Sequence, residues 1–348
     1  MKIKLGDLTK IRTGKLDANA STENGQYPFF TCSKETLRIA TYSYDCECVL
    51  VAGNGDLNVK YYKGKFDAYQ RTYIIEDNSN SRLYMPYLYY FMSSYIEKLR
   101  KQSIGGVIKY IKISNLTDVI IDLPSVEIQK DIVVILEKVK NIINNRKLEI
   151  EIFDIIIKSR FIELFGDPIS NPNDWEIVPL GKRCEIVTGN TPSRLEPENY
   201  GEYIEWIKSD NINTPSTFIT KAQECLSEIG FKKCRFVEAG SLLMTCIAGS
   251  INCIGNVAVT DRRVAFNQQI NAIVPKQDKV LYLYWLMLLS KPAIHSTINM
   301  ALKGILSKRQ LAEMAFPFPP IVLQEQFADF VKQVDKSKFS CYTNNSYN

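Results

Sequence analysis

The sequence predicts a mixed α/β (α+β) protein built from two copies of one domain. Two observations carry this prediction. Short motifs near the start of the chain recur in the same order in its second half. Between the copies, a stretch of about 40 residues has the apolar spacing of a coiled coil. We therefore expect two duplicated domains in a pseudo-two-fold arrangement, separated by long helices that form an antiparallel coiled coil.

Composition sets the broad class of protein. The chain has 348 residues, of which 45% are hydrophobic and 23% charged, enough for two cores and too apolar for global disorder. No apolar run reaches the roughly 18 residues of a membrane helix, and no signal peptide is visible. The nine cysteines lack the close spacing of a zinc site. We expect a cytoplasmic protein with reduced thiols, no metal, no cofactor and no membrane contact. The net charge of +5 permits a polyanionic partner without identifying one.

The duplication is first visible in paired glycines. Gly6 and Gly14 have the same separation as Gly181 and Gly189, within LGD…RTGK and LGK…VTGN. The offset of about 175 residues is too long for a solenoid repeat and fits a duplicated domain.

Three later segments continue the match in order. Residues 68–74 align with 266–272, 106–109 with 304–307, and 116–129 with 311–324. The offset has then grown to about 195 residues, so the second copy carries an insertion of roughly 20 residues. We expect this insertion between Thr191 and Phe236.

Each copy combines strand-like and helical segments. Residues 48–52 and 242–245 are apolar, β-prone and close to glycine or asparagine, as in strands that end in turns. Residues 86–101 and 281–300 are long enough for helices. We assign residues 1–124 to the first domain and residues 168–320 to the second.

A long helix is predicted over residues 125–167. Ser125 is a suitable N-cap, and Gly166 with Pro168 ends the pattern. Apolar residues follow coiled-coil steps of four and three at Ile128, Ile132, Ile135 and Val139. The helix would be about 60 Å long at 1.5 Å per residue. A buried core helix is the alternative, because residues 155–157 are all isoleucine.

A second, shorter helix follows the second copy. Leu323, Phe327, Phe330 and Val334 occupy the same seam positions as the four residues of the first helix. The pattern stops at Ser337, so we expect a helix over residues 321–338 and a disordered tail over 339–348. Two interpretations of the short helix stay open: a truncated or recombined product, and a naturally short terminus.

No catalytic motif is present. The sequence lacks a Walker A loop, GxSxG, HExxH, GxGxxG and the Asn/Asp-Pro-Pro-aromatic run of amino-methyltransferases. Its one histidine, His295, stands in a helical stretch and is expected to be packed. We therefore predict a protein that is not itself an enzyme.

The motifs in this order resemble the specificity (S) subunit of type I restriction–modification systems. The glycine motifs, residues 68–72, 206–212 and 266–269, and the junctions at Pro124 and Pro319 carry the resemblance, which covers residues 1 to about 338. It implies that each copy is a target-recognition domain that reads one half of a bipartite, asymmetric double-stranded DNA site. It also implies that the helices act as a spacer and dock methyltransferase (M) subunits, and through them a restriction (R) subunit.

Three other functions stay open at this point. The chain could be a non-catalytic protein-interaction scaffold whose two domains bind protein. It could be a truncated, inactive specificity subunit. A small-molecule enzyme with a site between the copies is disfavoured by the missing motifs.

Basic and amide side chains are the candidates for DNA contact, because cations bind phosphates and Arg, Asn or Gln read bases. In the first domain they are Lys60, Lys63, Lys65, Tyr69, Arg71 and Lys109. In the second they are Lys208, Ser209, Asn211, Arg262, Arg263, Asn267, Gln269, Lys303, Lys308 and Arg309. A solvated surface is the competing interpretation for any single cation. Gln268 aligns with Gln70 and is expected to be structural, and Trp206 is expected in a core.

Overall fold

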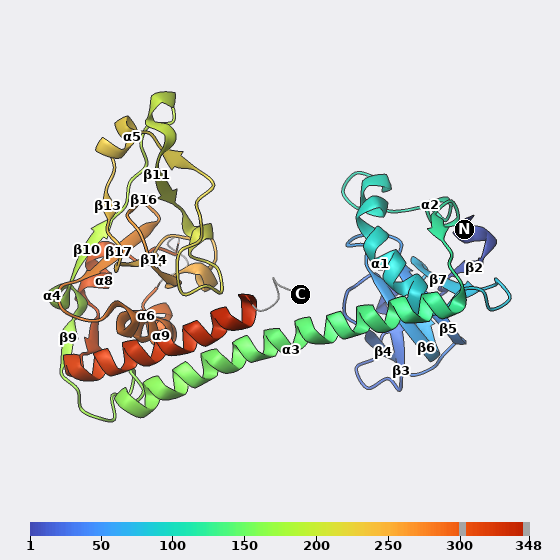
Figure 1. The fold of residues 1–348 in the computed structure, drawn as a ribbon, viewed down its shortest axis with the longest axis horizontal. Coiled ribbons are helices and arrows are strands. Elements are labelled where there is room, and N and C mark those ends of the chain that lie inside the picture. Colours follow the sequence, from blue (N-terminus) through green and yellow to red (C-terminus); the bar gives the residue numbers. More distant parts are fainter. Residues whose placement is uncertain (299–303, 344–348) are drawn as a thin grey trace. The chain divides into compact units, whose positions relative to one another are not determined.

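The chain forms two compact units, Met1–Asn145 and Arg146–Asn348 (Figure 1). The computed structural model describes residues 1–298 and 304–343, the last six of these by their backbone alone. No helix in the described ranges is both long and apolar enough to cross a membrane.

The first unit is organised around a six-stranded sheet in the order β2-β7-β5-β6-β3-β4. Its strands are β2 (Thr9–Thr13), β3 (Tyr27–Phe30), β4 (Leu37–Ile39), β5 (Tyr44–Ala52), β6 (Val59–Ala68) and β7 (Thr72–Asp77). All neighbours are antiparallel except β3 and β6, which are parallel. A separate antiparallel pair joins β1 (Lys2–Lys4) to β8 (Ile120–Asp122).

Helix α1 (Met85–Gln102) covers one face of this sheet. Pro86 stands in its first turn, where the missing N–H costs nothing. Its buried residues Leu88, Met92 and Leu99 belong to one apolar cluster with Val49 and other strand residues. The short elements of this unit are η1 (Leu5–Asp7), η2 (Ala18–Ala20) and α2 (Ser114–Thr117).

The second unit contains two four-stranded sheets. One has the order β10-β17-β14-β15 and consists of Cys184–Thr188, Ile270–Pro275, Leu242–Thr245 and Val257–Val259. The other has the order β12-β11-β16-β13 and consists of Cys225–Leu226, Tyr200–Ile207, Val264–Phe266 and Phe236–Val237. Strands β9 (Ile177–Pro179) and β18 (Ala315–Pro317) form an antiparallel pair.

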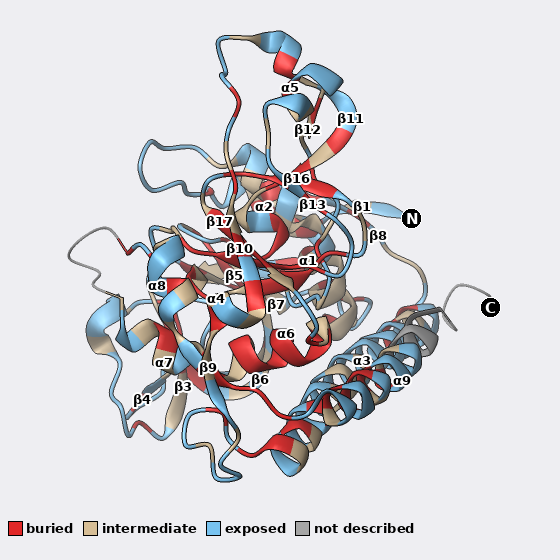
Figure 2. Ribbon diagram, turned by 90° about the vertical axis from the view of Figure 1, so that its left-hand side faces the viewer, coloured by how far each residue is buried: buried red, intermediate tan, exposed pale blue. Residues whose placement is uncertain are grey.

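The helices of the second unit are mostly short. They are α4 (Leu180–Arg183), α5 (Glu228–Lys232), α6 (Val280–Leu289), α7 (Lys291–Ser296), α8 (Lys308–Glu313) and the 3₁₀ turns η3 (Pro197–Asn199), η4 (Ser209–Asn211) and η5 (Ile251–Cys253). The helical stretch expected over residues 281–300 forms two helices, because the first helix ends at Ser290 between α6 and α7, and residues 299–300 lie outside the described residues. Pro292 cannot donate the backbone hydrogen bond that would continue α6. Figure 2 shows α6 as a buried helix.

The duplication is confirmed by strand pairing. The antiparallel pair β2–β7 recurs as β10–β17, and the parallel pair β3–β6 recurs as β11–β16. The pair β1–β8 likewise recurs as β9–β18. The additional residues of the second copy lie between β11 and β13, around η4 and α5, inside the predicted window.

One predicted match is out of register. The Ile111 N–H donates to the Gly53 carbonyl, and the Leu306 N–H donates to the Cys246 carbonyl, 2.9 Å in both cases. These bonds make Ile111 equivalent to Leu306, so the predicted alignment of Gly106 with Gly304 is wrong by three residues.

Helix α3 (Val126–Phe165) is continuous over 40 residues and agrees with the predicted long helix. Helix α9 (Ile321–Thr343) packs on its C-terminal part, where the Phe327 ring lies 5.3 Å from Phe161 and 5.6 Å from Phe165. Figure 2 shows the two helices side by side. The antiparallel helix pair is therefore present within the second unit.

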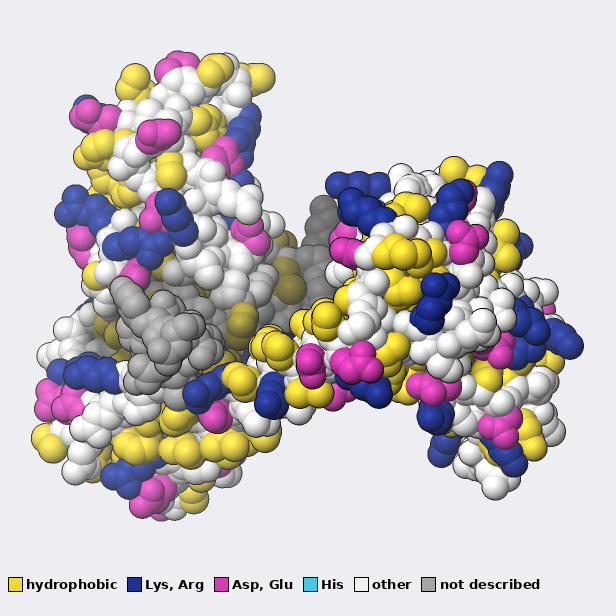
Figure 3. Space-filling view, turned by 45° about the vertical axis from the view of Figure 1, so that its right-hand side comes forward, with side chains coloured by type: hydrophobic (Ala, Val, Ile, Leu, Met, Phe, Trp, Pro, Cys, Tyr) yellow, Lys and Arg dark blue, Asp and Glu magenta, His cyan; other side chains and the backbone are white. Residues whose placement is uncertain are grey.

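The seam of α3 does not pair as predicted. In α9, Phe327 and Val334 are buried and Leu323 and Phe330 are half-buried. They belong to the core that contains Ile157, Phe161 and Phe165, and not to the first turns of α3. Ile128, Ile135 and Val139 are exposed and Ile132 is half-buried. Figure 3 shows hydrophobic side chains along the surface of α3. The predicted pairing is wrong because the two helices are antiparallel. The first turns of α9 therefore pack against the last turns of α3, and not against its first turns.

The predicted end of the second helix is also too early. Helix α9 continues to Thr343, so residues 339–343 of the predicted tail are helical. Residues 344–348 of that tail lie outside the described residues.

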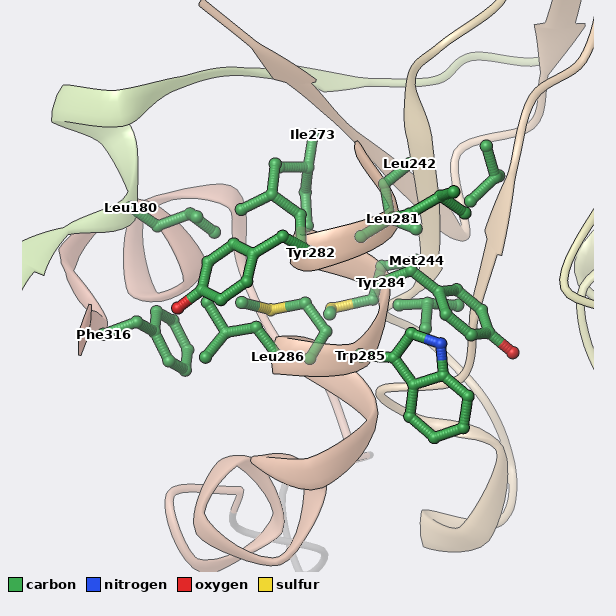
Figure 4. Close-up of a cluster of buried hydrophobic side chains, with 14 of the residues drawn as sticks. Leu180, Leu242, Met244, Ile273, Leu281, Tyr282, Tyr284, Trp285, Leu286 and Phe316 are labelled. Carbon is green, nitrogen blue, oxygen red and sulfur yellow. The ribbon is translucent and has the colours of Figure 1, made fainter. Parts of the chain in front are cut away.

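The core of the second unit surrounds α6. Tyr282 is buried, and its hydroxyl donates to the Pro317 carbonyl at 2.7 Å. Figure 4 shows Tyr282 pointing toward Leu180 and Phe316, with Tyr284 and Trp285 on the other side of the helix. His295 lies in α7, and its Nε2 is 2.7 Å from the Ile254 carbonyl, which agrees with a packed histidine.

Each copy has one buried glutamine at the start of its long helix. The Gln129 Oε1 accepts from the Tyr84 N–H at 2.8 Å, and its Nε2 donates to the Pro124 carbonyl at 2.9 Å. The Gln324 Oε1 accepts from the Lys279 N–H at 3.0 Å, and its Nε2 donates to the Pro319 carbonyl at 3.0 Å. The two side chains therefore tie α3 and α9 in the same way to the N-cap residues of α1 and α6.

We expect Gln324→Leu to lower the free energy of unfolding of the second unit by about 2–4 kcal/mol, because it leaves two buried backbone groups unpaired. Gln326→Leu is the matched control, since Gln326 is exposed on the same helix. Its effect should stay within about 0.5 kcal/mol. Urea unfolding followed by tryptophan fluorescence measures both, because Trp175, Trp206 and Trp285 all lie in the second unit. Equal losses in the two variants would contradict the role of Gln324.

Candidate nucleic-acid interface

Four backbone segments meet at one end of the first unit. The turn Tyr69–Thr72 joins β6 to β7, and its Arg71 carbonyl accepts from the Gly53 N–H at 2.8 Å. The Thr72 carbonyl accepts from the Gly14 N–H at 3.0 Å, and the Lys109 carbonyl accepts from the Gly55 N–H at 3.0 Å. We call these segments, residues 14–16, 53–55, 69–72 and 109–111, the first loop cluster.

Gly14 explains the first TG motif. A Cβ atom at this position would lie 2.1 Å from the Ala68 carbonyl oxygen, well inside van der Waals contact. Only glycine lets the chain approach the end of β6 this closely. The glycine of the first TG motif is therefore a requirement of the first loop cluster.

The first loop cluster presents polar side chains to solvent. Gln70, Arg71 and Lys109 are exposed, and their terminal groups make no hydrogen bond or ion pair with any residue that the structure describes. Gln70 and Arg71 line a small pocket of about 250 Å³ together with Thr13 and Tyr73. These groups are available to an external ligand.

Lys60 is linked to the cluster but is not free. Its Nζ donates to the Asn58 Oδ1 at 2.8 Å, and the Asn58 Nδ2 donates to the Cys32 carbonyl at 2.8 Å. The Cys32 thiol in turn donates to the Arg71 carbonyl at 3.4 Å. Burial lowers the pKa of Lys60 from its ordinary value. Cys32 and Asn58 thus support the turn, and no sequence pattern indicated this role for Cys32.

The remaining predicted residues of the first unit have internal contacts. Lys63 forms an ion pair with Glu47 at 3.1 Å, and the Lys65 ammonium lies 4.7 Å from the centre of the Tyr42 ring. Tyr69 is half-buried, and its N–H donates to the Phe30 carbonyl at 2.9 Å. Of the six residues predicted in this unit, Arg71 and Lys109 are the two whose terminal cations have no partner in the described part of the chain.

The second unit contains an equivalent cluster. The turn Asn267–Ile270 joins β16 to β17, and its Gln269 carbonyl accepts from the Cys246 N–H at 2.8 Å. The Ile270 carbonyl accepts from the Gly189 N–H at 3.0 Å. A Cβ atom on Gly189 would lie 2.2 Å from the Asn267 carbonyl oxygen. We call residues 189–191, 246–248, 267–270 and 304–306 the second loop cluster.

Asn267 holds the second turn and does not face solvent. It is 6% exposed, its Oδ1 accepts from the Gln269 N–H at 3.0 Å, and its Nδ2 donates to the Gln269 Oε1 at 3.1 Å. The Gln269 side chain is half-buried, and its Nε2 donates to none of the described residues. Gln269 therefore keeps its donor for a ligand, whereas Asn267 does not.

The expectation that Gln268 is a buried structural amide is wrong. Its side chain is exposed at the tip of the turn, and its Oε1 accepts from the Thr191 hydroxyl. Trp206, by contrast, is buried as expected.

Three predicted cations of the second unit are neutralised by acids. The Arg262 guanidinium binds both Glu205 oxygens at 2.7 and 2.8 Å and holds the pKa of Glu205 below its ordinary value. Arg263 pairs with Glu238 at 2.7 Å, and Lys208 pairs with Glu224. Hydrogen bonds from Arg194 are the largest cause of the lowered pKa of Glu224. A phosphate would have to displace these acids.

The η4 residues are also structural. Asn211 is 6% exposed, its Oδ1 accepts from the Lys208 N–H at 3.0 Å, and its Nδ2 donates to the Lys221 carbonyl at 3.1 Å. The Ser209 carbonyl accepts from the Ile212 N–H at 3.2 Å. All the amide groups that would let Asn211 read a base are thus occupied within the unit.

Helix α8 follows the second loop cluster directly. Lys308 is exposed and has no ion pair within the described chain, whereas Arg309 pairs with Glu313 at 2.7 Å. Ser307 caps the helix, and its hydroxyl accepts from the Gln310 N–H at 3.2 Å. Lys303 lies outside the described residues. Figure 3 shows Lys and Arg side chains spread over both units, interspersed with acidic ones.

One protein family, described as the type I restriction modification DNA specificity domain, matches residues 1–152 and 172–344. The EcoDI specificity subunit of Escherichia coli is 44% identical over 123 residues, 35% of this chain and 27% of that protein. The HindI specificity subunit of Haemophilus influenzae is 32% identical over 110 residues, 31% of this chain and 23% of that protein. The chain thus matches about a quarter of the length of these two type I restriction enzyme subunits.

Solved structures agree in fold. The S subunit of a type I restriction–modification system from M. genitalium aligns with a TM-score of 0.63 at 16% identity, covering 99% of this chain and 91% of that chain. A chain from a structure on complex assembly and conformational transition of the type I system aligns with a TM-score of 0.53 at 15% identity, covering 98% and 91%. Because the family matches both copies over most of their length, the chain belongs to the type I restriction modification DNA specificity domain family.

Proposed function

We propose that the protein is the sequence-specific DNA-binding subunit of a type I restriction–modification complex, without catalysis of its own. Each loop cluster reads one half of a bipartite, asymmetric site. The observation that carries this proposal is the recurrence of one backbone arrangement in both units, with arginine at one tip position of the first unit and glutamine at the equivalent position of the second. We assign residues 1–124 and 168–320 to target recognition and residues 125–167 and 321–343 to the spacer helices.

Three cations are the leading candidates for contact with DNA. Arg71, Lys109 and Lys308 have exposed terminal groups without a hydrogen bond, ion pair or ring contact among the described residues. They stand in or beside the loop clusters. An unpaired cation gains more from a phosphate than one that must first give up a carboxylate.

The partners that we propose besides double-stranded DNA are methyltransferase subunits and, through them, a restriction subunit, in the cytoplasm. The exposed apolar face of α3 supports a protein partner. Ile128, Ile135 and Val139 are 50%, 60% and 46% exposed, at spacings of seven and four residues along the helix. Such a stripe marks an interaction surface more often than a solvated helix.

Lys109→Ala and Lys308→Ala are expected to weaken DNA binding of the assembled complex and to lower its salt dependence. Each lost phosphate contact reduces the slope of log K against log salt by about one. Lys98→Ala is the matched control, because it removes an exposed lysine from α1, outside both clusters. Fluorescence anisotropy at several salt concentrations gives the slopes.

Unchanged slopes in Lys109→Ala and Lys308→Ala would remove these lysines from the interface. A complex that binds no DNA and keeps a salt-insensitive protein partner would favour the scaffold alternative instead.

A further inference from the structure

The two turns at the loop clusters are equivalent residue by residue. In each, the first residue of the turn donates to the parallel strand: the Tyr69 N–H to the Phe30 carbonyl at 2.9 Å, and the Asn267 N–H to the Ile207 carbonyl at 3.0 Å. The turns then close at 2.8 and 3.2 Å, from the Thr72 N–H to the Tyr69 carbonyl and from the Ile270 N–H to the Asn267 carbonyl.

The tips of the turns are fixed by further matching bonds. The Arg71 carbonyl accepts from the Gly53 N–H, and the Gln269 carbonyl accepts from the Cys246 N–H, 2.8 Å in both cases. Arg71 and Gln269 therefore occupy the same backbone position in the two copies. Gln70 and Gln268 occupy the position before them.

The first tip position is shared and the second is not. Gln70 and Gln268 are the same residue type and are both exposed. At the second position the first copy has arginine and the second has glutamine. A contact that is the same in both copies cannot make the two half-sites differ, whereas a contact that changes from guanidinium to amide can.

The chemistry of the differing pair is specific. An arginine in the major groove donates two hydrogen bonds to the O6 and N7 atoms of guanine, and a glutamine pairs with the N6 and N7 atoms of adenine. Among the described residues, the Arg71 guanidinium has no hydrogen-bond or ion-pair partner, and the Gln269 Nε2 donates to none of them. Asn267 holds the Gln269 Oε1 at 3.1 Å, which orients the amide before any base arrives.

We propose that Arg71 and Gln269 are equivalent specificity-determining residues, Arg71 selecting guanine in one half-site and Gln269 selecting adenine in the other. Gln70 and Gln268 make the contact that both half-sites share. This inference rests on the proposed function and adds to it the position and the base.

The test maps methylated motifs in cells that carry the methyltransferase subunits with wild-type protein, Arg71→Gln or Gln269→Arg. We expect Arg71→Gln to change one base pair of the first half-site from G·C to A·T and to leave the other half unchanged. Gln269→Arg should make the reverse change in the other half only. If both variants methylate the same motif as the wild-type protein, the inference is overturned and the proposed function is unaffected.

A binding measurement covers variants that no longer methylate. The assembled complex is titrated with duplexes that carry the wild-type motif or one base-pair change at each position. Arg71→Ala should lose about 10- to 100-fold discrimination at one G·C pair and keep it elsewhere. Uniform weakening at all positions would overturn the inference. Wild-type complex without any bipartite preference would instead overturn the proposed function, and this inference with it.

Discussion

Phe327→Ala is expected to lower the free energy of unfolding of the second unit by about 3–5 kcal/mol. Phe327 is fully buried and contacts the rings of Phe161 and Phe165, so it joins α9 to α3. The Phe161 ring in turn stacks on Tyr282 at 5.6 Å. Removing the Phe327 ring leaves a cavity at the point where both helices meet the core around α6.

Tryptophan fluorescence during urea unfolding measures this loss, since all three tryptophans lie in the second unit. Val322→Ala is the control on the same helix, because Val322 is 66% exposed. Its effect is expected within about 0.5 kcal/mol. A loss below 1 kcal/mol for Phe327→Ala would mean that α9 does not depend on this contact.

Insertion of a second copy of residues 138–144 after Asn144 is expected to lengthen the DNA spacer and leave both half-sites unchanged. The insertion is one heptad, so it keeps the apolar seam of α3 in phase. It adds about 10 Å of helix, which corresponds to about three base pairs at 3.4 Å each. It lies before Arg146, where the second unit begins, so the contacts of α9 are preserved.

Mapping of the sites that the assembled complex methylates measures the spacer length directly, as the number of base pairs between the two half-sites. Replacement of Asn144 and Asn145 by alanine keeps the helix length and should keep the spacer. An inserted variant that methylates the original motif with its original spacer would show that α3 does not set the distance between the half-sites.

The duplication and the long helix were predictable because their signals are local. A glycine is needed where the chain passes close against the end of a strand, as at Gly14 and Gly189. In both copies this glycine stands at the same distance in sequence from an earlier glycine. The apolar residues that predict α3 likewise lie in one continuous segment of the sequence. The pairing of α9 was not predictable in the same way, because the same spacing fits any stretch of an antiparallel partner.

The candidate site was only partly predictable, because charge pairing joins residues that are far apart in the sequence. Glu205 neutralises Arg262 and Glu238 neutralises Arg263. No pattern of neighbouring residues in the sequence predicts either ion pair. The alignment of the copies placed Gln70 with Gln268 correctly, but it assigned Gln268 to the interior. Exposure at the tip of a turn depends on the strands on either side, which only the folded unit defines.

We expect the two equivalent loop clusters to read two different half-sites. Mapping of methylated positions in a genome that expresses this protein with its methyltransferase subunits tests it most directly. If both clusters read DNA, the map will show one split, asymmetric motif with a spacer of fixed length. A stable complex that methylates no motif, or a motif that is continuous or symmetric, would contradict it.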